Sequence, residues 1–163
     1  MDFAIPIAPL VSSCRTVASD FFTTFFENIG DPKRYDRGKI TFDSGVASPF
    51  VKYAVYASEA TFKNIEIELS DGKDWLVEGK YSLADLGLTP YLARLEYLNL
   101  LEVWLSSKKY TQSWWERIKT RPSFKKAISD VLTKDEIGEM VDSGSKIRDQ
   151  ITLIRDGLRV RNL

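Results

Sequence analysis

Residues 75–95, which read WLVEGKYSLADLGLTPYLARL, decide the fold of this chain. Within them Ser82 and Asp85 lie three positions apart and precede an apolar run, which is the pattern of a capping box with aspartate in place of the usual glutamate. In such a box the serine oxygen accepts a hydrogen bond from the N–H of Asp85, and the carboxylate accepts one from the N–H of Ser82. Tyr81 and Leu86 occupy the hydrophobic-staple positions on either side. The stretch therefore predicts a helix that begins directly after Ser82.

The helix predicted after this box is apolar almost all the way round. A helix without a polar face is normally buried at the centre of a domain. Pro90 lies inside it and removes the hydrogen-bonding partner of the Leu86 carbonyl, so we expect a kink near Leu86. The apolar positions are Leu83, Leu86, Leu88, Tyr91, Leu92, Leu95, Leu98 and Leu101.

Two helices, separated by a loop, are predicted before the box. The first spans about residues 9–29, where apolar side chains recur every three or four positions. Residues 30–47 are polar and carry three glycines, so we expect a loop there. A second helix begins at Ser48 and Pro49, because serine can cap free N–H groups and proline suits a first turn, and it ends at residues 70–72. Its apolar stripe consists of Val51, Ala54, Val55, Ser58, Phe62, Ile65 and Leu69.

Two shorter helices are predicted after the box. Residues 111–120 form one, with Trp114, Trp115 and Ile118 inward or partly inward. The two tryptophans are expected to be a buried anchor and a half-exposed neighbour. Pro122 breaks this helix and begins a second, short one.

A second capping box begins a long last helix. It consists of Thr133 and Glu136, with Leu132 and Ile137 at the staple positions, and the helix falls within residues 132–163. Its apolar residues form a narrow seam, which predicts docking on its own bundle or, alternatively, contact with a partner helix or with an absent domain. The seam consists of Ile137, Met140, Gly144, Ile147, Ile151, Ile154 and Leu158.

The element count predicts an all-α fold. Residues 65–69 alternate like a strand, but the flanking period is helical and no partner strand is evident, so helix is favoured. The prediction is a bundle of five or six helices with a buried central helix, built as one domain over residues 1–163.

Composition excludes several classes of function. The 23 Lys and Arg residues equal the 23 Asp and Glu residues, which gives no electrostatic case for a nucleic acid or an anionic membrane as partner. The absence of histidine removes Ser–His and Cys–His dyads and His-containing zinc sites, and no metal site is expected. A single cysteine, Cys14, excludes an intrachain disulfide and fits a cytoplasmic location. No apolar run approaches the roughly 20 residues of a membrane helix, and residues 3–14 lack the basic start of a signal peptide.

Two blocks of this sequence resemble the signature of glutathione S-transferase C-terminal domains. The first is residues 75–95, with a Trp-Leu-x-x-Gly turn, the Ser-Leu-Ala-Asp box and a helix that contains a proline. The second is residues 114–124, WWERIKTRPSF, which is similar to the family's ending of Trp-x-Arg followed by Arg-Pro-Ser-Phe. Together the correctly spaced blocks cover about 50 residues, and the resemblance implies the fold of that all-helical domain.

The resemblance also implies a division of labour. Ser82 and Asp85 would be the folding box of the core helix and not catalytic groups. Glutathione, the co-substrate of the family, would bind to an N-terminal thioredoxin-like domain, which this sequence is expected to lack. The chain alone is then expected to bind no cofactor and to be inactive, with that domain as its partner and a homodimer as its possible assembly. The loop expected at residues 30–47 and the tail after Thr133 depart from the commonest family plan.

Four residues of the first helix are candidates for a substrate pocket. Cys14, Ala18, Phe21 and Phe25 share one face, and the family builds the wall of its apolar electrophile pocket from this helix. The structural alternative is ordinary core packing of a small cysteine and of the aromatic run. No catalytic residue is assigned.

Two functions follow as hypotheses from different classes. In the first, the chain is the electrophile-pocket and dimerisation domain of a glutathione S-transferase-like enzyme. In the second, it is a non-catalytic protein–protein interaction module of the same fold, like those that assemble translation factors and synthetase complexes. Fold alone does not separate the two.

Overall fold

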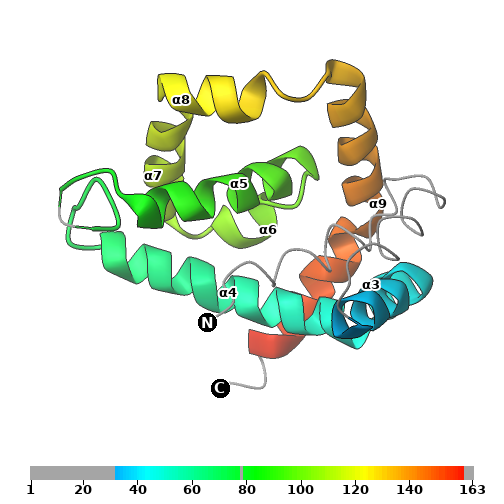
Figure 1. The fold of residues 1–163 in the computed structure, drawn as a ribbon. Coiled ribbons are helices and arrows are strands. Elements are labelled where there is room, and N and C mark those ends of the chain that lie inside the picture. The colour runs from blue at the N-terminus through cyan, green and yellow to red at the C-terminus, as the bar shows by residue number, and fades with distance from the viewer. Residues whose placement is uncertain (1–31, 78, 160–163) are drawn as a thin grey trace. The chain divides into compact units, whose positions relative to one another are not determined.

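The computed structural model describes residues 32–77 and 79–159, and this part of the chain is all-helical, as predicted (Figure 1). Its only extended pairing within those residues is an isolated bridge between Val77 and Lys80. The described residues form seven α-helices, accompanied by a 3₁₀ turn at Gly45–Ala47 and a π turn at Lys125–Ser129. The helices are α3 (Pro32–Ser44), α4 (Pro49–Leu69), α5 (Leu83–Tyr97), α6 (Glu102–Leu105), α7 (Lys109–Lys119), α8 (Pro122–Phe124) and α9 (Lys134–Arg159).

The described residues fall into two compact units. The middle unit comprises Glu59–Asp142, and the terminal unit comprises residues 32–58 and 143–159. Helices α4 and α9 each contribute residues to both units.

The prediction of a loop over residues 30–47 is wrong, because helix α3 occupies most of this segment. Gly45, with φ of 55°, adopts the left-handed conformation that ends a helix, whereas Gly38 lies inside α3. Thr41 is buried and donates a hydrogen bond to the Arg37 carbonyl at 2.8 Å, and its hydroxyl lies 3.3 Å from that of Ser48. The segment after Pro32 contains no further proline, and a glycine inside a helix costs only about 1 kcal/mol, so its polar composition did not exclude a helix. The helix predicted over residues 9–29 lies outside the described residues.

Helix α4 confirms the predicted second helix, including residues 65–69. Ser48 accepts a hydrogen bond from the Phe50 N–H at 3.3 Å, and Gly72, with φ of 78°, follows the last turn. Every residue of the predicted stripe is at most 4% exposed. The 3.6-residue period thus identified the buried face of this helix correctly.

Helix α5 is shorter and less buried than predicted. It ends at Tyr97, because Asn99 takes a left-handed φ of 55°, and Leu101 belongs to the turn before α6. Leu83 is 83% exposed and Leu86 is 52% exposed. The prediction that every side of this helix is buried is therefore wrong for its first turn. The inward face of that turn holds Asp85, which is fully buried. Further along, Leu92, Ala93 and Leu95 enter the core.

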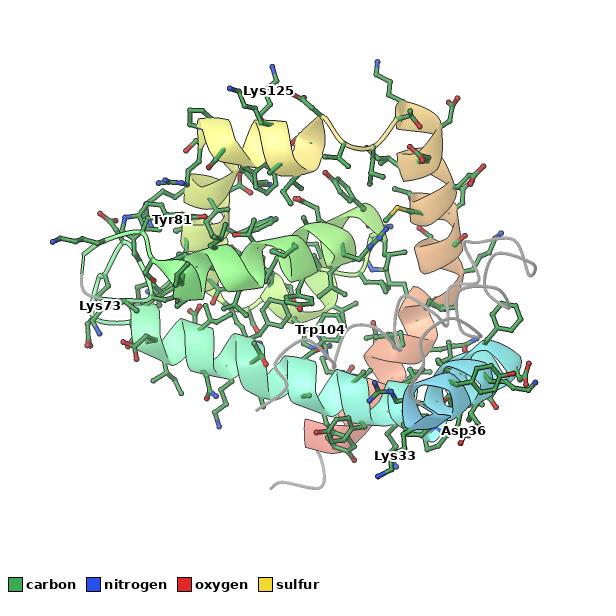
Figure 2. The ribbon with its side chains drawn as sticks, in the orientation of Figure 1. Lys33, Asp36, Lys73, Tyr81, Trp104 and Lys125 are labelled. Carbon is green, nitrogen blue, oxygen red and sulfur yellow. The ribbon has the colours of Figure 1, made fainter. Side chains whose placement is uncertain are left out.

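Aromatic side chains fill the core of the middle unit. Trp104 of α6, labelled in Figure 2, is fully buried. It stacks on Phe62 of α4, with ring centroids 5.8 Å apart. Trp114 is fully buried and Trp115 is only 1% exposed, so the expectation that one of the two is half-exposed is wrong. The Trp115 ring meets Phe124 edge-on at 5.6 Å, so the α8 segment covers it.

The long last helix is present as α9. Along its predicted seam Met140, Gly144 and Ile151 are buried, and Ile137, Ile147 and Ile154 are half-buried. Within the part of the chain that the structure describes, no helix is long and apolar enough to cross a membrane.

Candidate functional site

The structure describes the predicted capping residues but not the predicted pocket residues. Cys14, Ala18, Phe21 and Phe25 lie outside the described residues. Ser82 and Asp85 form a reciprocal cap, and so do Thr133 and Glu136 in the second box. The best-defined site in the described chain is therefore built around the Asp85 carboxylate.

The first capping box has the expected reciprocal geometry. Ser82 has an extended backbone, and its Oγ accepts a hydrogen bond from the Ala84 N–H at 3.2 Å. In return, Oδ2 of Asp85 accepts from the Ser82 N–H at 2.9 Å and from the Ser82 hydroxyl at 3.0 Å. Two free donors at the start of α5 are thereby satisfied.

The second oxygen of Asp85 ties α5 to two other parts of the middle unit. Its Oδ1 accepts from the Leu76 N–H at 3.1 Å and from Nε1 of Trp114 at 2.8 Å. The loop after α4, the start of α5 and the middle of α7 thus converge on one carboxylate. A carboxylate has about four acceptor positions, and four donors occupy them here. Asp85 therefore has a structural role, since it has no acceptor left for a proton from a substrate.

The second box repeats the pattern in an exposed setting. Oε2 of Glu136 accepts from the N–H and from the hydroxyl of Thr133, both at 2.8 Å, and Oγ1 of Thr133 accepts from the Glu136 N–H at 3.3 Å. The backbone hydrogen bond from Thr133, followed by that from its hydroxyl, holds the pKa of Glu136 below its ordinary value.

An arginine–aromatic cluster, consisting of Trp75, Tyr81, Arg117 and Arg121, holds the loop before α5. Tyr81 lies near the start of α5 (Figure 2). The rings of Trp75 and Tyr81 meet edge-on at 5.2 Å, and the Arg121 guanidinium lies 3.6 Å from the Tyr81 ring centre. Arg117 lies 5.6 Å from the Trp75 ring and forms an ion pair with Asp74 at 2.9 Å. Cation–π contacts of this kind stabilise by about 0.5–2 kcal/mol each, so the cluster fixes the loop against α7 and α8.

A capping residue that the sequence did not reveal begins α7. Glu66 projects from α4, and its carboxylate accepts from the Tyr110 N–H at 3.2 Å, from the Thr111 N–H at 2.8 Å and from the Thr111 hydroxyl at 2.7 Å. No short-range pattern marks this cap, because its partners are more than 40 positions away. Burial alone would raise the pKa of Glu66, but these hydrogen bonds, with a smaller contribution from the Lys108 charge, outweigh it and lower the pKa.

We expect this cap to make the middle unit sensitive to acid. A carboxyl whose pKa is lowered by folding stabilises the native state above its unfolded pKa, near 4.5, and that stabilisation is lost as the pH falls through the folded pKa. Glu66→Gln should lower the free energy of unfolding at pH 7 by about 1 kcal/mol and flatten its decline below pH ~5. Urea unfolding between neutral and acidic pH measures both quantities.

Glu68→Gln is the matched control for this prediction. Glu68 lies two residues further along α4 and is half-exposed in an ion pair with Lys73, which predicts a loss of about 0.5 kcal/mol or less. Equal pH profiles for Glu66→Gln and the parent protein would contradict the proposed cap.

The described residues show no metal centre. No group of three or more His, Cys, Asp or Glu side chains within residues 32–77 and 79–159 is placed to hold a metal ion. The Asp85 site holds a loop, the start of α5 and the middle of α7 together.

Comparison with known proteins relates part of this chain to one enzyme family. A segment of 58 residues is 41% identical to "Glutathione S-transferase TCHQD" of Arabidopsis thaliana. The match covers 36% of this chain and 22% of that protein, so it spans about a fifth of the relative's length. No family model matches the chain, and no solved structure matches it. The similarity supports a glutathione S-transferase-like relationship over that segment.

Proposed function

We propose that this chain is the helical, substrate-side domain of a glutathione S-transferase-like protein. The observation that carries the proposal is the set of hydrogen bonds to the Asp85 carboxylate. It connects the two sequence blocks that resemble the family, because the capping box of residues 75–95 is hydrogen-bonded to Trp114 at the start of the second block. The 41% identity over 58 residues to a plant glutathione S-transferase supports the same assignment.

In this proposal a thioredoxin-like domain, on the same or another polypeptide, binds glutathione and lowers the pKa of its thiol. The thiolate is then the nucleophile. The helical domain supplies an apolar pocket that holds the electrophile near the sulfur, a contribution that acts through proximity and orientation. Cys14, Ala18, Phe21 and Phe25 remain the proposed wall of this pocket, and the helical domain also contributes to a homodimer face.

The proposal predicts that activity depends on joining the two parts. The 163-residue chain alone should not conjugate glutathione to 1-chloro-2,4-dinitrobenzene and should not be retained on glutathione-agarose. The same chain fused behind a glutathione S-transferase thioredoxin-like domain should gain conjugating activity, because the thiolate and the electrophile pocket are then in one molecule. Absorbance of the conjugate measures the rate.

Substitutions in the fusion test the pocket. Phe21→Ala and Phe25→Ala should raise KM for the electrophile while KM for glutathione is unchanged. Phe26→Ala should leave both unchanged, because the predicted helical period places Phe26 off the shared face. Retention of the isolated chain on glutathione-agarose would contradict the proposal that a separate thioredoxin-like domain binds glutathione. A fusion that is folded by circular dichroism but inactive with several electrophiles would favour the alternative, a non-catalytic interaction module.

A further inference from the structure

The terminal unit contains a groove that the proposed function does not use. Its volume is about 370 Å³, which is within the usual range for small-molecule sites. One wall is the 3₁₀ turn with the first turns of α4, and the other is the end of α9. Most of the lining is apolar and includes Val46, Pro49, Leu153 and Ile154. Leu153 is 72% exposed, so a large apolar side chain faces solvent at this groove.

Two polar side chains stand one helical turn apart on α4 in this groove. Lys52 is exposed and Tyr56 is half-buried. Within the part of the chain that the structure describes, no carboxylate pairs with the Lys52 ammonium and no hydrogen bond engages the Tyr56 hydroxyl. Positions four apart share a helix face, so both groups can reach one ligand. The carboxylate nearest in sequence to the α9 wall, Asp156, is already paired with Arg155 at 2.7 Å.

We infer that this groove binds a small apolar monocarboxylate. Its apolar body lies against Leu153, Ile154 and Pro49, where it removes apolar surface from water. Its carboxylate accepts hydrogen bonds from the Lys52 ammonium and the Tyr56 hydroxyl, which are charge-assisted. The charge of Lys52 selects an anion, and the apolar walls select against small hydrophilic anions.

Gly157 provides a way to close the groove without disturbing the fold. It lines the groove, and a Cβ built there meets no atom within 4 Å. A leucine at this position has room, and it raises the helix propensity of α9. Gly138, on the same helix but outside the groove, also has open space around a built Cβ and is the matched control.

The test uses octanoate and octanamide, which share an apolar body and differ in charge. Titrations of the full chain, followed by ¹H–¹⁵N NMR, should show octanoate binding about tenfold more tightly than octanamide. Gly157→Leu should weaken octanoate binding by about tenfold or more, whereas Gly138→Leu should leave it unchanged. Lys52→Met, which keeps the aliphatic stem, should reduce octanoate affinity to that of octanamide.

Three results would overturn the inference. These are equal affinities for octanoate and octanamide, unchanged octanoate binding in Gly157→Leu, and no octanoate binding at millimolar concentration. Each leaves the proposed transferase role untouched, because that role is tested with a fused domain and with other residues.

Discussion

Asp85→Ala should lower the free energy of unfolding of the middle unit by about 3–5 kcal/mol. The substitution leaves two inward donors, the Leu76 N–H and Nε1 of Trp114, without an acceptor, and it removes the cap of α5. A buried donor left unsatisfied costs about 1–3 kcal/mol, and a lost cap costs about 1 kcal/mol. Because whole domains are stable by only about 5–15 kcal/mol, the variant should be close to unfolding.

Urea unfolding followed by tryptophan fluorescence measures this loss, since all four tryptophans lie in the middle unit. Glu136→Ala is the matched control, because Glu136 plays the same part in the second box but is exposed. Its loss of stability should be much smaller than that of Asp85→Ala, because solvent replaces the lost hydrogen bonds at an exposed cap. Similar losses for the two variants would show that Asp85 acts as a local cap only and not as the junction of the unit.

Leu95→Ala should destabilise the protein by about 3–5 kcal/mol, whereas Leu83→Ala should change its stability by less than about 0.5 kcal/mol. Both leucines lie on α5, but Leu95 is fully buried and Leu83 is 83% exposed. Truncating Leu95 removes its transfer free energy and leaves a cavity, and truncating Leu83 does neither.

Urea unfolding measures both variants. When the slope of unfolding free energy against urea concentration is unchanged, the shift in midpoint reports the change in stability directly. The two substitutions are chemically identical and lie on one helix, so differences in helix propensity largely cancel. A large loss for Leu83→Ala would show that the first turn of α5 is covered in solution, for example by another chain.

Much of the fold could be predicted because its signals are local. The stripe of α4 follows from a 3.6-residue period, and the starts of α5 and α9 follow from residues three positions apart. The failures concern burial and helix formation that no capping or periodic pattern marks. The polar segment of α3 contains a buried threonine, Thr41, and Trp115 is covered by Phe124.

The candidate site divides in the same way. The sequence identified both capping pairs, Ser82 with Asp85 and Thr133 with Glu136, because the members of each pair are only three positions apart. The role of Glu66 was not identifiable, because it caps a helix 44 residues away, and neither was the groove beside Lys52, whose two walls lie about 100 positions apart.

The sequence by itself determined that this protein is helical and where α4, α5 and α9 begin, because caps and periodicity depend on neighbours within one or two turns. Only the tertiary structure decided that Asp85 joins a loop to two helices, and that the first leucines of α5 face water. Burial and long-range hydrogen bonds depend on which surfaces meet, and residues distant in sequence settle that only once the chain has folded.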